Sequence, residues 1–164
     1  MNVNRLRDTA RQIRRDIVEM THYASSGHPG GSLSSAEIMA VLYFHVLRHD
    51  PARPQWEERD RFYLSKGPAC PVLYAALGEA GDFDKAAFRL LRKLGSILQG
   101  HPHRLKTPGV EASSGSLGQG LSLAAGTALG LRMDKKKSRV FCLLGDGGHQ
   151  RVHRVAVDLQ RVPA

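Results

Sequence analysis

The feature that most limits the fold is a short apolar run that ends in an aspartate between two glycines. Residues 140–144 read Val-Phe-Cys-Leu-Leu, and Gly145-Asp146-Gly147 follows directly. A short apolar run bounded by turn residues predicts a buried β-strand. Because ligands of open α/β sheets bind beyond the carboxyl ends of the strands, Asp146 is a candidate ligand for a hard cation such as Mg²⁺. An ordinary strand-to-helix turn also favours these three residues, so alone they leave both interpretations open.

Helical patterns dominate the first 50 residues. Apolar side chains between residues 6 and 24 recur at steps of three and four and predict an amphipathic helix. A Gly- and Pro-rich loop is expected at residues 27–31. A second helix is expected to start at Ser34, which has capping-box spacing with Glu37, and to bury a face that includes Ile38 and Val41.

Further segments predict a layered α/β fold. Residues 61–65 suggest a short strand, and helical patterns return at 72–77, 85–94 and 117–133. Glycines in the last of these lower helix propensity by roughly 1 kcal/mol each relative to alanine, which indicates that something packs very close to it. Helices around a buried strand predict an α/β domain with a mostly parallel sheet flanked by helices.

Composition narrows the class of partner. The net charge of +9 is spread along the chain, and only 6% of residues are aromatic, so specific nucleic-acid binding is not favoured and an anionic small molecule fits better. No apolar stretch approaches the roughly 20 residues of a membrane span, and the N-terminus lacks a secretory pattern. A cytoplasmic location without membrane association is expected. The two cysteines, Cys70 and Cys142, are expected to be structural.

Two loops carry candidate chemistry. Each holds a Gly-His-Pro unit, one centred on His28 and one on His101. A histidine on a glycine-rich backbone can exchange protons near neutral pH, although a solvated histidine in a helix connection gives the same pattern. Residues 115–120 resemble a glycine-rich phosphate loop that opens a helix, but they match neither G-x-G-x-x-G nor a Walker motif.

Five motifs in this order resemble the transketolase family, in its N-terminal thiamine-diphosphate-binding part. They are SGHPG at 26–30, DRFYLSKG at 60–67, TPGVE at 107–111, GQG at 118–120 and GDG at 145–147. The resemblance implies a partial three-layer thiamine-diphosphate-binding fold over residues 1–147, which stops before the family's domain is complete. Residues 148–164 are expected to form a divergent tail.

The resemblance also implies a role for seven residues. His28 and His101 would face the reacting centre of a ketose and handle its hydroxyl and carbonyl protons. The other five would hold thiamine diphosphate and Mg²⁺: Gly31 near the cofactor, Gly115 and Leu117 at its thiamine moiety, Asp146 as the metal ligand and Gly147 beside the diphosphate. A two-carbon ketol unit would pass between sugar phosphates, with the carbanion chemistry supplied by the cofactor.

The chain departs from the family pattern at several points. Pro68 stands where the family has a histidine that reaches the diphosphate, and Ser116 stands where it has proline. Beyond Gly147 the sequence turns basic, with Arg151 near the place of a family glutamate that helps subunit contact. The family's second metal ligand and its pyrimidine-binding domain have no counterpart here. Catalysis is therefore expected to need a homodimer or a complementing C-terminal chain.

Two other functions stay open at this point. The chain is also compatible with a catalytically inactive remnant that binds ligands or a partner. It is compatible as well with a hydrolase of another class, with His28 or His101 as the base and a loop serine as nucleophile: Ser26, Ser113, Ser114 or Ser116. No G-x-S-x-G elbow supports the hydrolase.

Overall fold

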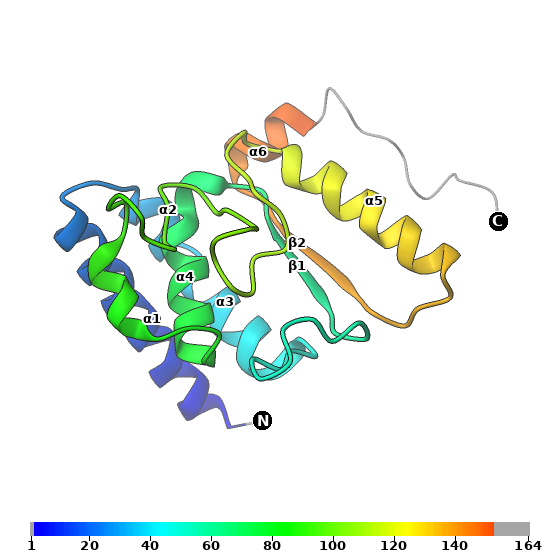
Figure 1. Cartoon of the computed structure of the whole chain (residues 1–164), viewed down its shortest axis with the longest axis horizontal. Helices are drawn as coiled ribbons and strands as arrows, with labels where there is room; N and C mark the ends of the chain where they lie inside the picture. The colour runs from blue at the N-terminus through cyan, green and yellow to red at the C-terminus, as the bar shows by residue number, and fades with distance from the viewer. Residues whose placement is uncertain (1, 153–164) are drawn as a thin grey trace.

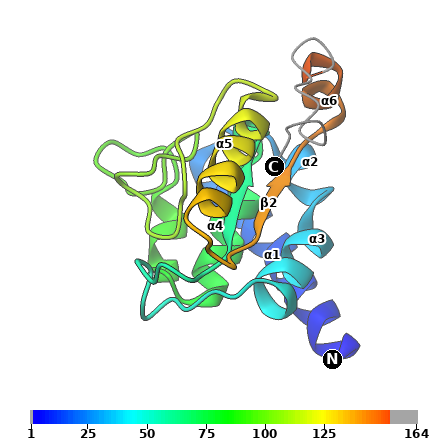
Figure 2. The ribbon, with the colours of Figure 1, turned by 90° about the vertical axis from the view of Figure 1, so that its right-hand side faces the viewer.

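The chain folds into helical layers on both faces of a small parallel sheet. The computed structural model describes residues 2–152. Figure 1 shows the helices α1 (Val3–Ala24), α3 (Ala36–Val41) and α4 (Cys70–Ala80) on one side of the sheet, and α5 (Gln119–Met133) on the other. The quarter turn in Figure 2 places α5 in front of the sheet and the remaining helices behind it. The three layers match the predicted α/β arrangement.

The long first helix confirms the amphipathic pattern. Asn2 caps α1, because its Oδ1 accepts the backbone N–H groups of Asn4 and Arg5. The helix ends where Ser25 adopts a left-handed conformation, with φ of 47°. Its apolar stripe is fully buried against α3 and α4 and includes Ile13 and Ile17. Burying this stripe is what stabilises a helix of otherwise charged sequence.

The segment after α1 differs from the prediction in two ways. Residues 29–31 of the expected loop instead begin the short helix α2 (Pro29–Leu33), in which proline occupies the first turn, where its missing N–H costs nothing. The expected capping box does not form: the Ser34 hydroxyl donates to the Gly31 carbonyl at 3.1 Å, and Glu37 pairs with Arg14. The helix therefore starts two residues later than predicted.

The predicted apolar face of this second helix is also wrong. Ile38 is 47% exposed and Val41 is 39% exposed, while Met39 and Ala40 are buried. Because the side chain of Ala40 is small, α3 can lie close to α1 and α4. The face that allows this close approach turns inward, although Ile38 on the other face is the larger apolar residue. A π-helical turn, η1 (Leu42–Val46), follows α3.

The helix α4 is the most deeply buried element. Every residue from Cys70 to Gly78 is buried, because the helix lies between α1 and the sheet. A 3-10 turn, η2 (Gly67–Ala69), leads into it. The helical pattern predicted at residues 85–94 is found as a shorter 3-10 helix, η3 (Lys85–Leu90).

The two strands pair in parallel. β1 (Arg61–Leu64) lies beside β2 (Val140–Leu143), with Arg61 opposite Val140 and Leu64 opposite Leu143. Both predicted strands are confirmed, but the expectation that residues 140–144 are buried is wrong. All four residues of β2, Cys142 included, are only half-buried, because in the described part of the chain β2 pairs with β1 alone.

The glycine-rich helix α5 packs closely at one end only. A Cβ on Gly120 would lie 2.7 Å from the Cα of Ser65, so glycine is required there. A Cβ on Gly126 or Gly130 would meet nothing within 4 Å, so the predicted close packing is confirmed at Gly120 and wrong further along.

The described part of the chain ends in α6 (Asp146–Val152), which begins directly after β2. This helix runs across the predicted boundary at residue 147, and that boundary stays a prediction. Residues 153–164 of the predicted tail lie outside the described residues. Between residues 2 and 152 no helix is both long and apolar enough to cross a membrane.

Candidate functional site

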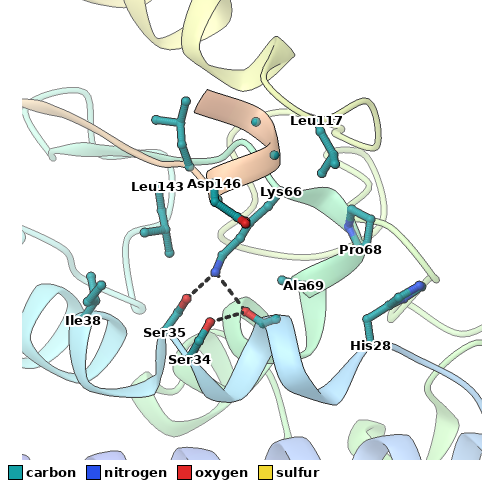
Figure 3. Close-up of a pocket in the computed structure, with 15 residues that line it drawn as sticks. His28, Ser34, Ser35, Ile38, Lys66, Pro68, Ala69, Leu117, Leu143 and Asp146 are labelled. Carbon is teal, nitrogen blue, oxygen red and sulfur yellow. Dashed lines mark hydrogen bonds between the residues drawn. The ribbon is translucent and has the colours of Figure 1, made fainter. Parts of the chain in front are cut away.

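An open cleft lies at the carboxyl ends of the two strands. Its volume is about 660 Å³. Five of the seven residues predicted from the sequence line it: His28, Gly31, Leu117, Asp146 and Gly147. Figure 3 shows Ile38 and Leu143 on one side of the cleft and His28 on the other. Parallel strands end at the same edge of a sheet, so the loops after β1 and β2 meet here, as ligand sites of α/β folds require.

The chain reaches the cleft from three directions. β2 turns at Gly145 into α6, which places Asp146 at the edge of the sheet. β1 continues through Ser65, whose carbonyl accepts the Gly118 N–H at 3.1 Å and so ties the start of α5 to the same edge. The short helix α2 supplies Gly31 from the opposite layer.

Lys66 is the cleft residue that the sequence reasoning missed. Its ammonium donates to the Gly31 carbonyl at 2.9 Å and to the Ser35 hydroxyl (Figure 3). Burial lowers the pKa of Lys66 below its ordinary value, and the nearby Asp146 carboxylate partly offsets this effect. A half-buried ammonium in a cleft is a natural partner for an anionic ligand. Its position directly after a predicted strand was the available signal.

The glycines of the cleft leave room for a ligand. A Cβ on Gly31, Gly145 or Gly147 would meet its nearest neighbour only at 3.8, 3.5 and 3.9 Å, which is ordinary contact distance. Packing within the protein therefore does not require glycine at these positions. Their missing side chains instead leave backbone open to the cleft. At Gly67, by contrast, a Cβ would lie 2.7 Å from the backbone of Gly115, and glycine is needed there for packing.

His101 and Gly115 lie outside the set of residues that line the cleft. A Cβ on Gly115 would lie 3.6 Å from the Cδ2 atom of the His101 ring, so the two are neighbours. Gly115 in turn contacts Gly67, at the start of η2. The long loop that carries both residues therefore packs against Gly67, the residue before Pro68 of the cleft.

A scan against protein-family models gives one decisive match. Residues 4–148 match the family described as transketolase, thiamine diphosphate binding domain. The chain belongs to the transketolase family. The human transketolase is 48% identical over 143 residues, which cover 87% of this chain and 23% of the human protein. A protein of Clostridium sp. (strain MSTE9), 6-deoxy-6-sulfo-D-fructose transketolase subunit SqwG, is 42% identical over 142 residues and is covered to 52%.

Solved transketolase structures confirm the fold. The chain superposes on the transketolase of Campylobacter jejuni with a TM-score of 0.85 and 35% identity, covering 92% of this chain and 25% of that one. It superposes on a Pichia stipitis transketolase in complex with sedoheptulose-7-phosphate with a TM-score of 0.84 and 34% identity, covering 88% and 23%. The predicted partial α/β thiamine-diphosphate-binding fold is thus confirmed. The chain spans about a quarter of the length of these transketolases.

The cleft suits the cofactor of this family better than its metal. Lys66 and the open backbone of Gly147 fit a diphosphate, and the apolar side chains of Ile38 and Leu117 fit a heterocyclic ring. Asp146 is an exposed single carboxylate beside an ammonium, and the described residues contain no group of three or more metal-ligating side chains. Mg²⁺ prefers several oxygen ligands, so this chain alone fits it poorly. The metal role of Asp146 stays a prediction.

The geometry gives no support to the hydrolase alternative. A serine nucleophile needs an imidazole within hydrogen-bond reach. In the described part of the chain, none of the four candidate serines bonds to a histidine ring. The hydroxyl of Ser26 accepts from Arg92, that of Ser113 accepts the Arg104 N–H, and that of Ser114 is buried without a partner.

Proposed function

We propose that this chain supplies the diphosphate-binding side of a transketolase-type active site, and that it transfers two-carbon ketol units between sugar phosphates together with a complementing chain. The observation that carries the proposal is the cleft at the strand ends. There an ammonium, an open glycine backbone and an apolar wall meet, in a chain of the transketolase family. When bound, thiamine diphosphate would supply the carbanion chemistry.

The cofactor contacts follow from the lining of the cleft. Lys66 lines the cleft and its ammonium is held there by Gly31 and Ser35, and this positive charge suits a diphosphate. Gly147 lets phosphate oxygens approach the backbone beside it. Leu117 and Ile38 form the apolar surface for the thiamine rings. Gly115, which lies against Gly67, is proposed to contact the thiamine moiety together with Leu117.

The two histidines are assigned to the substrate. His28 lies at the start of α2 with an exposed side chain on the rim of the cleft, where it can meet a sugar hydroxyl. His101 is exposed on the loop that packs against Gly67 through Gly115. Histidine exchanges protons near neutral pH, so both are proposed to take protons from the hydroxyl groups of the ketose or donate them to its carbonyl oxygen.

The partner is proposed to complete the site. Asp146 offers one carboxylate, so further ligands for Mg²⁺ would come from a complementing chain or a second copy. A relative described as a transketolase subunit, 52% covered by this chain, is consistent with a divided enzyme. The half-buried strand β2 and the exposed Ile38 leave apolar surface for such a partner. We place this assembly in the cytoplasm.

Calorimetric titration with thiamine diphosphate, with and without Mg²⁺, tests the cofactor half of the proposal. We expect saturable binding that Lys66→Met weakens roughly 10- to 100-fold, because a hydrogen bond to a charged group contributes about 1.5–3 kcal/mol. Lys137→Met is the matched control, since Lys137 is exposed and precedes β2 at the opposite edge of the sheet. Absence of binding by the unaltered chain, or equal binding by Lys66→Met, would contradict the proposal.

A chimera tests the catalytic half. Residues 4–148, which match the family, would replace the corresponding stretch of human transketolase. Ketol transfer by the chimera would support the proposed function. A folded chimera that binds thiamine diphosphate but turns over no sugar phosphate would identify the chain as an inactive remnant.

A further inference from the structure

Arg92 adopts an unusual backbone conformation between the two loops that carry His28 and His101. Its φ is +63°, in the left-handed region that residues other than glycine rarely adopt. Its N–H donates to the Leu98 carbonyl at 2.8 Å, which closes a tight turn after η3. Strained backbone of this kind persists where surrounding contacts hold it, and it often occurs at functional sites.

The first contact of the Arg92 side chain is with the loop of His28. Its guanidinium donates to the Ser26 hydroxyl. Ser26 lies two residues before His28, in the connection between the left-handed Ser25 and the start of α2. This bond joins two segments that are 66 residues apart in the sequence.

The second contact is with the residue that precedes His101. The guanidinium lies against Gly100, where an added Cβ would be 2.9 Å from Nε and 3.0 Å from Nη2 of Arg92. The Gly100 carbonyl accepts a hydrogen bond from the Cys70 thiol at 3.2 Å. Burial raises the pKa of that thiol to about 12, so it remains a donor at neutral pH. Cys70 and Arg92 thus both hold the Gly100 backbone.

We propose that Arg92 is a positioning residue that fixes the two histidine-bearing loops relative to each other. A planar guanidinium with five donors can bond Ser26 through Nη1 and turn its Nε–Nη2 edge to Gly100 at the same time, which a lysine ammonium cannot do. The catalytic meaning of this link rests on the proposed function, because only there do both histidines meet one substrate. The link itself is a property of the described fold.

Histidine ring resonances of the full 164-residue chain, measured by NMR without any ligand, test the link. We expect Arg92→Ala to shift the resonances of both His28 and His101. The rings of His45 and His49, which lie outside the two loops, should not move, and the melting temperature should change little because Arg92 is exposed.

Three further variants separate the two contacts. Ser26→Ala removes only the first contact and should shift His28 alone. Gly100→Ala places a methyl group against the guanidinium and should shift His101 alone. Arg92→Lys can still donate to Ser26 but has no second nitrogen edge to face Gly100, so it should restore His28 and leave His101 shifted.

Two outcomes would overturn the proposal. One is an Arg92→Ala spectrum in which both rings keep their wild-type positions. The other is a general shift of all histidines with a lower melting temperature, which would make Arg92 a stability residue only. Calorimetry keeps the proposed function separate, because Arg92 does not line the cleft and its removal should leave thiamine diphosphate affinity unchanged. If the unaltered chain does not bind thiamine diphosphate, the proposed function is refuted, but the proposed role of Arg92 in linking the two loops is not.

Discussion

The two sides of the sheet are packed to very different degrees. On the side of α1 and α4, Ile17 and Leu77 are completely buried, and α4 is buried on every face. On the other side, β2 is half-buried throughout, and α5 leaves Leu129 37% exposed and Met133 81% exposed. Residues 2–152 close the first layer and cover the second only in part. The cleft lies where the two meet, with Gly31 from the closed side and Leu117 from the open side.

The largest expected effect contrasts one leucine from each side. Leu77→Ala should lower the free energy of unfolding by about 2–5 kcal/mol, because a completely buried leucine leaves a cavity when it is truncated. Leu129→Ala, on the outer surface of α5, should cost less than about 1 kcal/mol. Urea denaturation of both variants measures the difference. Equal losses would show that the chain packs its two layers alike, contrary to the structure.

The closed layer contains one buried carboxyl group that should make stability depend on pH. Asp16 on α1 is 3% exposed, and its Oδ2 has no hydrogen-bond donor. Burial raises its pKa to about 7, and the neighbouring Glu79 carboxyl adds to the rise, while Gln12 and Lys85 act in the opposite direction. Burial disfavours the charged carboxylate over the neutral carboxyl group, so the folded state binds the Asp16 proton more tightly than the unfolded state.

The sign of the effect follows from proton binding. Between the ordinary pKa of 3.8 and about 7, the folded chain holds a proton that the unfolded chain has lost. Stability should therefore fall as pH rises through this window, by about 1.4 kcal/mol for each pH unit at most. Asp16→Asn imitates the protonated form, and the variant should gain stability over wild type progressively as pH rises from the ordinary pKa of 3.8 to about 7. Parallel stability profiles for the two proteins would rule out the raised pKa of Asp16.

Sequence patterns predicted those elements of the closed layer that are amphipathic. The steps of three and four in α1 were sufficient because one stripe of that helix is apolar and the rest is charged. The same reasoning failed at α3, where Met39 and the small Ala40 turn inward while the larger Ile38 is exposed. Helix packing distance is a property of the assembled layer, and a single helix sequence does not contain it.

The open side shows the other limit of sequence reasoning. The apolar run of β2 predicted a strand correctly, but its burial depends on neighbours that the run itself cannot specify. In the cleft, motifs identified Gly31 and Asp146 because their order matched a family. Lys66 was missed because its role comes from contacts with Gly31 and Ser35, more than 30 residues away in the sequence.

The helix α5 allows the same contrast within one element. Gly120→Ala should destabilise the protein by about 1–3 kcal/mol, because the added methyl group would lie 2.7 Å from the Ser65 backbone. Gly126→Ala, where nothing lies within 4 Å, should stabilise it by up to about 1 kcal/mol through helix propensity. Melting temperatures of the two variants measure both effects. A loss of stability in Gly126→Ala would mean that a neighbour covers this part of α5.

The smallest expected effect concerns the cleft between the two sides. Pro68 lines it and has no polar side chain, at the position where the transketolase pattern has a histidine. Pro68→His would add a ring donor beside Lys66 and should strengthen thiamine diphosphate binding by roughly 2- to 10-fold, or about 0.5–1.5 kcal/mol. Pro68→Leu, which adds no donor, is the matched control for calorimetry. If Pro68→His and Pro68→Leu bind thiamine diphosphate equally, an added donor on the closed side does not raise the affinity. The affinity is then limited on the open side, where the proposed partner would supply further ligands.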